Sequence, residues 1–186
     1  MGILLGFLPF LAFAVLSLST GALAALIVGA AVSAGLIIRN HMRGGSVKIL
    51  EAGTFLLFVA LAVYTLAVGQ GLAIIAVRLC VDFGLFGIVL ASMIIGHPFT
   101  LQYAKEQVSA EHWASPLFVR ANYVISAAWA VAFLVMAIAE AAMLAVPGFP
   151  TSLGSIVIVA ALLGAVLFTR WRVEAGRRRT SLGTSD

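Results

Sequence analysis

Apolar residues fill most of the chain in six long runs, separated by short polar or glycine-containing connections. The runs cover residues 3–18, 22–38, 49–69, 72–96, 118–146 and 153–168. A helix needs about 20 residues to cross a bilayer whose hydrocarbon core is about 30 Å thick, within a range of about 17 to 25. The pattern therefore predicts an all-α polytopic membrane protein with six transmembrane helices, the first two of them at the short end of that range.

The connection after the fourth run, residues 97–117, is the longest and has a mixed pattern. Pro98 is suited to begin a helix, and apolar positions such as Leu101 and Tyr103 alternate with polar ones such as Lys105. This pattern is typical of a short amphipathic helix in the membrane interface. We expect Lys105 to point to water and Leu101 to pack toward lipid or the bundle.

Composition agrees with a membrane protein. Of the 186 residues 63% are hydrophobic and only 10% are charged, whereas soluble domains carry about 25% charged residues. The polar connections are too short to bury a core of their own, so a separate soluble domain is excluded. The single cysteine, Cys80, excludes an intramolecular disulfide.

Charge predicts the topology. The connections 19–21, 69–71 and 147–152 carry no charge, whereas the connections 39–53 and 97–117 and the tail 169–186 contain all the lysines and arginines that lie outside the runs. The positive-inside rule then places both termini in the cytoplasm. A basic juxtamembrane cluster in the tail is suited to anionic lipids and makes nucleic acid an improbable partner; it comprises Arg170, Arg172, Arg177, Arg178 and Arg179.

Four polar side chains interrupt the fourth and fifth runs: Arg78, Asp82, Asn122 and Glu140. A charge near the bilayer centre costs roughly 2.5 to 3.5 kcal/mol, so these residues are the candidate site. Arg78 and Asp82 share a helix face at a spacing of four, and Asn122 and Glu140 share one because eighteen residues make five turns. The large side chains near that second stripe are expected to line the site: Trp129, Phe133 and Met136.

Two interpretations of these charges stay open. In the first, Arg78 pairs with Glu140 and Asp82, and the pairing fixes the packing of the fourth span on the fifth. In the second, two carboxylates with one arginine leave a spare negative charge that binds a proton or a cation. A third possibility is a set of polar groups that faces lipid or a partner protein.

Other patterns indicate packing rather than chemistry. Small residues recur every four positions in the second run, at Gly21, Ala25, Gly29 and Ser33, and let another helix approach closely. The histidines lie on separate connections without metal-ligand spacing, and the sequence contains no phosphate loop, zinc-protease helix or nucleophile elbow. We expect no catalytic residues, no metal and no cofactor.

The chain resembles the intracellular septation protein A family of bacterial inner-membrane proteins. The resemblance rests on Phe7-Leu8-Pro9, Ala25-Leu26-Ile27-Val28, Gly96-His97-Pro98 and Ala128-Trp129-Ala130-Val131-Ala132-Phe133, and on their spacing along nearly the whole chain. It departs from the family at His97, where a lysine is usual, and at Glu140, where an asparagine is common. The resemblance implies a multi-pass inner-membrane protein and no established catalytic residues.

Three functions follow as hypotheses. The resemblance favours a protein that maintains the cell envelope or supports septation through contacts with lipids and other inner-membrane proteins. The alternative is a small oligomeric transporter or channel that uses Arg78, Asp82 and Glu140. A third is an accessory subunit of a larger membrane complex. An enzyme is least favoured, because no nucleophile–base pair is visible.

Overall fold

The structure, a computed structural model, describes residues 5–68 and 73–182, and side chains as far as residue 176. In these residues all regular elements are helical: α2 (Leu8–Leu16), α3 (Ala22–Met42), α4 (Ile49–Val68), α5 (Ile74–Ile94), α6 (Phe99–Lys105), the 3-10 helix η1 (Ala110–His112), α7 (Pro116–Ala145) and α8 (Thr151–Leu182).

Five of these helices are long and apolar enough to cross a membrane: α3, α4, α5, α7 and residues Thr151–Gly176 of α8. The prediction of an all-helical protein with several membrane-spanning helices is therefore confirmed, with five candidate spans among the described residues. The first run is different: its described residues form the nine-residue α2, with Pro9 in its first turn, preceded by helical Leu5 and Gly6 and a turn at Phe7. Nine residues rise about 14 Å, which is too short to cross a core of about 30 Å. In the described residues, five of the six predicted spans are therefore long enough to cross a membrane, and the first run contributes the short α2 instead.

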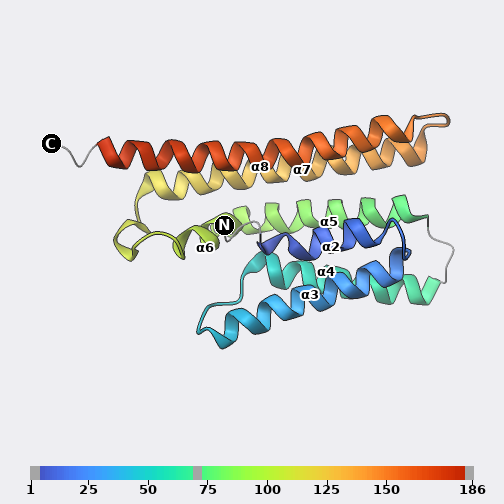
Figure 1. The fold of residues 1–186 in the computed structure, drawn as a ribbon, viewed down its shortest axis with the longest axis horizontal. Coiled ribbons are helices and arrows are strands. Elements are labelled where there is room, and N and C mark those ends of the chain that lie inside the picture. The colour runs from blue at the N-terminus through green and yellow to red at the C-terminus, as the bar shows by residue number, and fades with distance from the viewer. Residues whose placement is uncertain (1–4, 69–72, 183–186) are drawn as a thin grey trace.

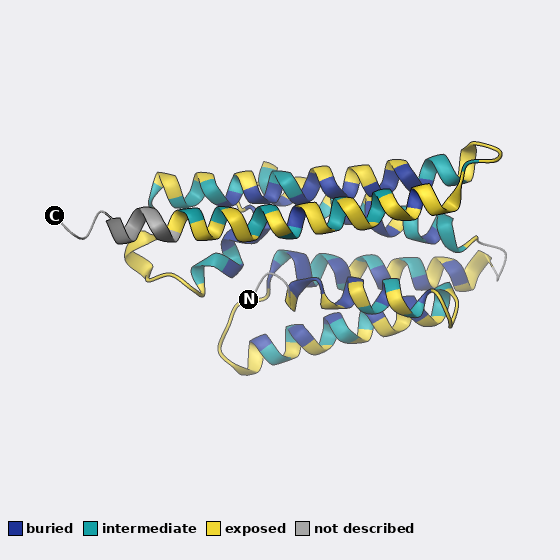
Figure 2. Cartoon of the chain, turned by 45° about the horizontal axis from the view of Figure 1, so that its top comes forward, coloured by how far each residue is buried: buried dark blue, intermediate teal, exposed yellow. Residues whose placement is uncertain are grey.

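The helices run up and down, so their connections gather at two ends (Figure 1). We call the end with residues 43–48, α6 and the last turns of α8 the α6 end, and the end with residues 17–21 and 146–150 the hairpin end. Helix α3 packs on α2 and α4, and α5 packs most extensively on α7, which pairs with α8 along one side. In the most apolar part of α7 56% of residues are buried, against 11% in α8 (Figure 2). Helix α7 is thus central and α8 peripheral.

Helix α2 is held by aromatic packing. The Phe7 ring, just before it, stacks on Trp129 with centroids 4.0 Å apart, and Phe10 meets Phe133 edge-on at 6.1 Å. Such pairs add about 0.5 to 1.5 kcal/mol each beyond the buried area. The phenylalanines of the first run therefore fix α2 against the middle of α7.

Helix α6 lies beneath the start of α2. A Cβ atom on Gly6 would overlap the Tyr103 phenol, and the Phe99 ring is 5.8 Å from Phe7. Thr100 is fully buried, and its hydroxyl donates to the Asn122 carbonyl oxygen at 2.9 Å. The short helix expected in this connection is present, but it is embedded in the bundle.

Two helices extend further than the hydrophobic pattern predicts. Helix α3 continues four residues past the predicted end, to Met42, and α8 continues through Leu182. The tail expected to start at residue 169 is therefore a continuation of the last helix. Within it Arg170 is exposed and Arg172 is half-buried, whereas the side chains of the other three arginines of the basic cluster lie outside those described.

The small-residue stripe packs as predicted, with one exception. Ala25, Gly29 and Ser33 are buried, and a Cβ on Gly29 would lie 2.6 Å from the Phe58 ring of α4. Gly21 is instead an exposed turn residue, whose φ of +84° favours glycine.

Candidate functional site

Asp82 and Glu140 form a pair of carboxyl groups in the interior of the candidate spans. Each is 2% exposed, and the two groups interact directly across the α5–α7 interface. At 1.5 Å per residue, Asp82 lies about 12 Å from the start of α5 and Glu140 about 8 Å from the end of α7. We call these two residues the carboxyl pair.

Arg78 does not form the ion pairs that we predicted. Among the described residues no arginine lies within 4.0 Å of a carboxylate; the ion pairs are those of Lys48. Instead the Arg78 guanidinium donates to the Ser17 hydroxyl oxygen, from Nη2 at 2.9 Å and from Nε at 3.3 Å. Ser17 is buried at the end of α2, where the helix dipole also attracts a cation. Arg78 therefore acts on the carboxyl pair only from a distance.

One oxygen of the carboxyl pair has no partner. Glu140 Oε2 is buried without a hydrogen bond. Buried polar atoms are nearly always hydrogen-bonded, because desolvation without a partner is costly. Two carboxyl groups that face each other in a low-dielectric interior also repel when both are charged. A proton or small cation bound between them relieves both problems.

The other predicted site residues do not join the carboxyl pair. Asn122 lies at the α6 end, about 27 Å from Glu140 along α7, and its Nδ2 donates to the Phe118 carbonyl oxygen at 2.9 Å. Trp129 donates from Nε1 to Thr169 Oγ1 at 3.0 Å and so ties α7 to α8. Phe133 is fully buried in the core, as is Met136, one turn before Glu140.

A second buried polar cluster lies at the α6 end, where α3, α4 and α6 meet. We call it the polar lock; its members are Asn40, Lys48, Glu51, Tyr103 and Glu106. Lys48 Nζ is 2.8 Å from Glu106 Oε1, 3.9 Å from Glu51 Oε1 and 4.5 Å from the centroid of the Tyr103 ring. Glu51 accepts hydrogen bonds from Asn40 Nδ2 at 2.7 Å and from the Tyr103 hydroxyl at 3.5 Å.

The charges of the polar lock are matched. Lys48 is 4% exposed and Glu51 2%, yet each has an opposite charge beside it. Burial, and then the Glu51 carboxylate, raise the pKa of Tyr103 above its usual range, so the phenol keeps its proton and remains a donor. A cluster with this many mutual partners is suited to joining helices.

Sequence reasoning missed the polar lock. We assigned Lys48 and Glu51 to a solvated connection, although their spacing of three residues beside an apolar run is a signal of a helical pair. Tyr103 and Glu106 come from α6, more than fifty residues away, and only the tertiary fold brings them to Lys48.

No metal site emerges from the described residues, because none of their histidine, cysteine, aspartate and glutamate side chains form a group of three or more suited to a metal ion. Comparisons with protein-family models, curated proteins and solved structures find no match to this chain.

Proposed function

We propose that this chain is a small transporter or channel of the membrane whose carboxyl pair binds a proton or a small cation. The observation that carries the proposal is the arrangement at Asp82 and Glu140: two buried carboxyl groups face each other, and one Glu140 oxygen has no partner. Ionisable residues inside membrane spans typically mark ion pathways or proton relays.

The position of Arg78 favours this function over a purely structural role. A structural role requires the guanidinium to neutralise the carboxylates, and a planar guanidinium is able to contact two of them at once. Arg78 instead donates to Ser17, so among the described residues no cation is in direct contact with the carboxyl pair. The pair is therefore left with the capacity to bind one.

Flux through reconstituted vesicles tests the proposal. We expect the protein to dissipate a proton or Na⁺ gradient, and Asp82→Asn with Glu140→Gln to abolish this flux while the protein still inserts and folds. Glu111→Gln, the same chemical change at an exposed position of η1, is the matched control and should retain full flux. Equal flux in the double variant and the unmodified protein would exclude the carboxyl pair as the site.

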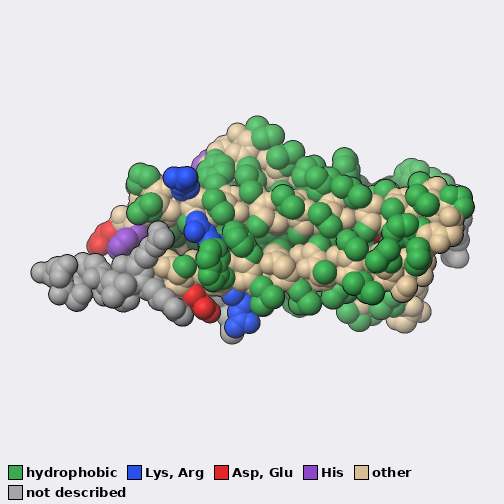
Figure 3. Space-filling view, turned by 90° about the horizontal axis from the view of Figure 1, so that it is seen from above, with side chains coloured by type: hydrophobic (Ala, Val, Ile, Leu, Met, Phe, Trp, Pro, Cys, Tyr) green, Lys and Arg blue, Asp and Glu red, His purple; other side chains and the backbone are tan. Residues whose placement is uncertain are grey.

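We further propose that the α6 end, where α8 ends, faces the cytoplasm of a bacterial inner membrane. Support comes from the charged side chains. On the face shown in Figure 3 they gather toward the left, which is the side of α6 in Figure 1. The five candidate spans alternate in direction, so the connections after α3 and α5 and the end of α8, which carry the basic residues, lie on one side. In a Cys80→Ser background, an impermeant thiol reagent should label a cysteine at Thr151 from outside and leave cysteines at Ser46 and Ser181 unlabelled.

A role in envelope maintenance or septation through protein contacts is the second candidate. The observation that favours it is α8, which packs chiefly on α7 and exposes a stripe of large apolar side chains. The stripe consists of Ile156, Val159, Leu163 and Leu167. Its spacing of three and four residues presents one helix face to a neighbour in the membrane.

Site-specific crosslinking in native membranes tests this second candidate. A photoreactive residue at Leu163 should capture another inner-membrane protein of the envelope or, in a homo-oligomer, a second copy of the chain. A photoreactive residue at buried Ala165 is the control for reaction within one chain. Capture of lipid alone at Leu163 would contradict the contact role.

A further inference from the structure

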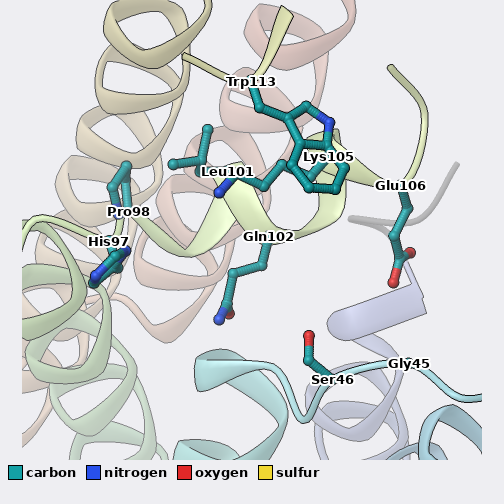
Figure 4. A pocket seen from close by; sticks show the side chains of 9 residues that line it. All are labelled: Gly45, Ser46, His97, Pro98, Leu101, Gln102, Lys105, Glu106 and Trp113. Atoms are coloured by element: carbon teal, nitrogen blue, oxygen red, sulfur yellow. The ribbon is translucent and has the colours of Figure 1, made fainter. Parts of the chain in front are cut away.

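A cavity of about 420 Å³ opens at the α6 end, between the 43–48 connection and α6 (Figure 4). Small-molecule sites commonly measure about 300 to 1,000 Å³. The cavity is lined by Gly45, Ser46, His97, Pro98, Leu101, Gln102, Lys105, Glu106 and Trp113. Neither the carboxyl pair nor Arg170 and Arg172, the members of the basic cluster whose side chains the structure describes, line it.

The walls of this cavity are fixed by hydrogen bonds. The Ile49 backbone N–H donates to Gln102 Oε1 at 2.7 Å, which ties α6 to the start of α4. Trp113 Nε1 donates to the Val108 carbonyl oxygen at 3.0 Å and holds the indole over the opening. The cavity is therefore a preformed feature of the fold.

The cavity wall carries hydrogen-bond donors and one acceptor that are still able to bind a ligand. The oxygen of Gln102 is engaged, so its amide nitrogen remains to donate. Lys105 has no carboxylate within 4.0 Å in the described part of the chain; its Nζ is 5.3 Å from the centroid of the Trp113 ring. Glu106 gives Oε1 to Lys48, and its side chain stays 51% exposed, with the second oxygen free to accept.

The two charges lie on different sides of the cavity. Figure 4 shows Lys105 beside Trp113, Glu106 on the other side, and Gln102 pointing from α6 toward the connection that holds Ser46. One cationic and one anionic group separated in this way match a zwitterion better than a simple anion or cation. Leu101 and Pro98 add an apolar wall.

We propose that this cavity binds a phosphate ester that carries a primary amine, as in the headgroup of a zwitterionic phospholipid. The phosphate accepts from Lys105 Nζ and the Gln102 amide, and the ammonium donates to Glu106. Charge-assisted hydrogen bonds of this kind are the strong ones in proteins. The cavity lies just beyond Ile94, where α5 ends, and next to Trp113, a residue type enriched at the level of lipid headgroups.

Ligand-dependent thermal stability of the purified protein tests this proposal. A ligand that binds the folded state raises the unfolding midpoint. In detergent we expect phosphatidylethanolamine to raise the midpoint more than phosphatidylglycerol, which lacks the amine, or phosphatidylcholine, whose amine has no N–H. Lys105→Gln should weaken the apparent affinity for phosphatidylethanolamine about tenfold or more, whereas Arg170→Gln, the same charge removal on exposed α8, should not.

The remaining arms distinguish the source of the ligand. Soluble phosphoethanolamine that reproduces the full shift supports the same chemistry and assigns it to a free metabolite; a shift with the lipid alone assigns it to the membrane. Equal shifts from all three lipids, or a phosphatidylethanolamine shift that survives Lys105→Gln, would overturn the proposal.

Discussion

The polar lock and the carboxyl pair are both buried in an apolar helical protein, but only the polar lock has a cation in contact with its carboxylates. In the polar lock, Lys48 lies between two carboxylates, and Glu51 accepts from neutral donors as well. In the carboxyl pair, the groups of Asp82 and Glu140 face each other, and the nearby cation donates to a serine. The buried groups of the polar lock therefore have hydrogen-bond and ion-pair partners, whereas Glu140 Oε2 in the carboxyl pair has none.

This contrast shows why burial alone does not identify a binding site. Lys48 and Glu51 of the polar lock are 4% and 2% exposed and both members of the carboxyl pair are 2% exposed, so the desolvation costs of these four side chains are comparable. What differs is the matching of donors, acceptors and charges, and an unmatched buried polar group needs a specific explanation, such as a bound ion. The account therefore assigns packing to the first cluster and binding to the second.

The largest effect is expected from Lys48→Ala, which leaves Glu51 buried without its cation. Breaking a buried pair by removing one partner costs about 3 to 5 kcal/mol, so the free energy of unfolding in detergent should fall by that amount. Lys48→Ala combined with Glu51→Gln should recover part of the loss, since no uncompensated charge remains there. Unchanged stability of the single variant would show that the polar lock does not hold the helices.

A smaller effect is expected from Ser17→Ala, which removes the acceptor of both Arg78 hydrogen bonds. Hydrogen bonds to charged groups contribute about 1.5 to 3 kcal/mol, and the unfolding free energy should fall within that range. Ser19→Ala, at an exposed serine in the same connection, is the control and should change little. If Ser17→Ala also has no effect, the guanidinium is already compensated by the carboxyl pair, and the contrast between the clusters weakens.

The smallest effect on stability is expected from Glu140→Gln, because it removes a repulsive charge and supplies a donor. Replacing buried charges by neutral groups is often neutral or stabilising, so we expect a change between zero and a gain of about 1 kcal/mol. Glu51→Gln, the same substitution in the polar lock, should instead destabilise the protein. Similar losses in the two variants would remove the distinction that the structure draws.

The sequence predicted the long helices well because hydropathy and length are local properties. The run 49–69 became α4 (Ile49–Val68), and the run 118–146 became α7 (Pro116–Ala145). The run 3–18 is as apolar as the others, but in its described residues the helix is interrupted by a turn at Phe7 before α2, where Tyr103 and Phe99 of α6 pack against Gly6 and Phe7. No pattern within that run shows this contact.

The candidate site was predicted in part for a similar reason. Helical spacing and the cost of charges within spans grouped Asp82, Glu140 and Arg78 as one candidate site, and α5 and α7 do lie side by side. The same reasoning paired Arg78 with the carboxylates, because it had no means of seeing the Ser17 hydroxyl sixty-one residues away. The shared helix face was also misleading for Asn122. Five helical turns bring Asn122 and Glu140 to the same stripe of α7 but leave them about 27 Å apart along the helix axis.

Site-mapped labelling with dicyclohexylcarbodiimide tests the central claim most directly, since this apolar reagent reacts with protonated carboxyl groups inside membranes. The account predicts modification of Glu140 or Asp82 in the intact protein, slowed by rising pH for a proton site and also by Na⁺ for a cation site. Glu51, whose carboxylate is engaged by Asn40 and Lys48, should remain unmodified in the same sample. Modification of Glu51 at an equal rate, or none at Glu140 and Asp82 at any pH, would contradict the account.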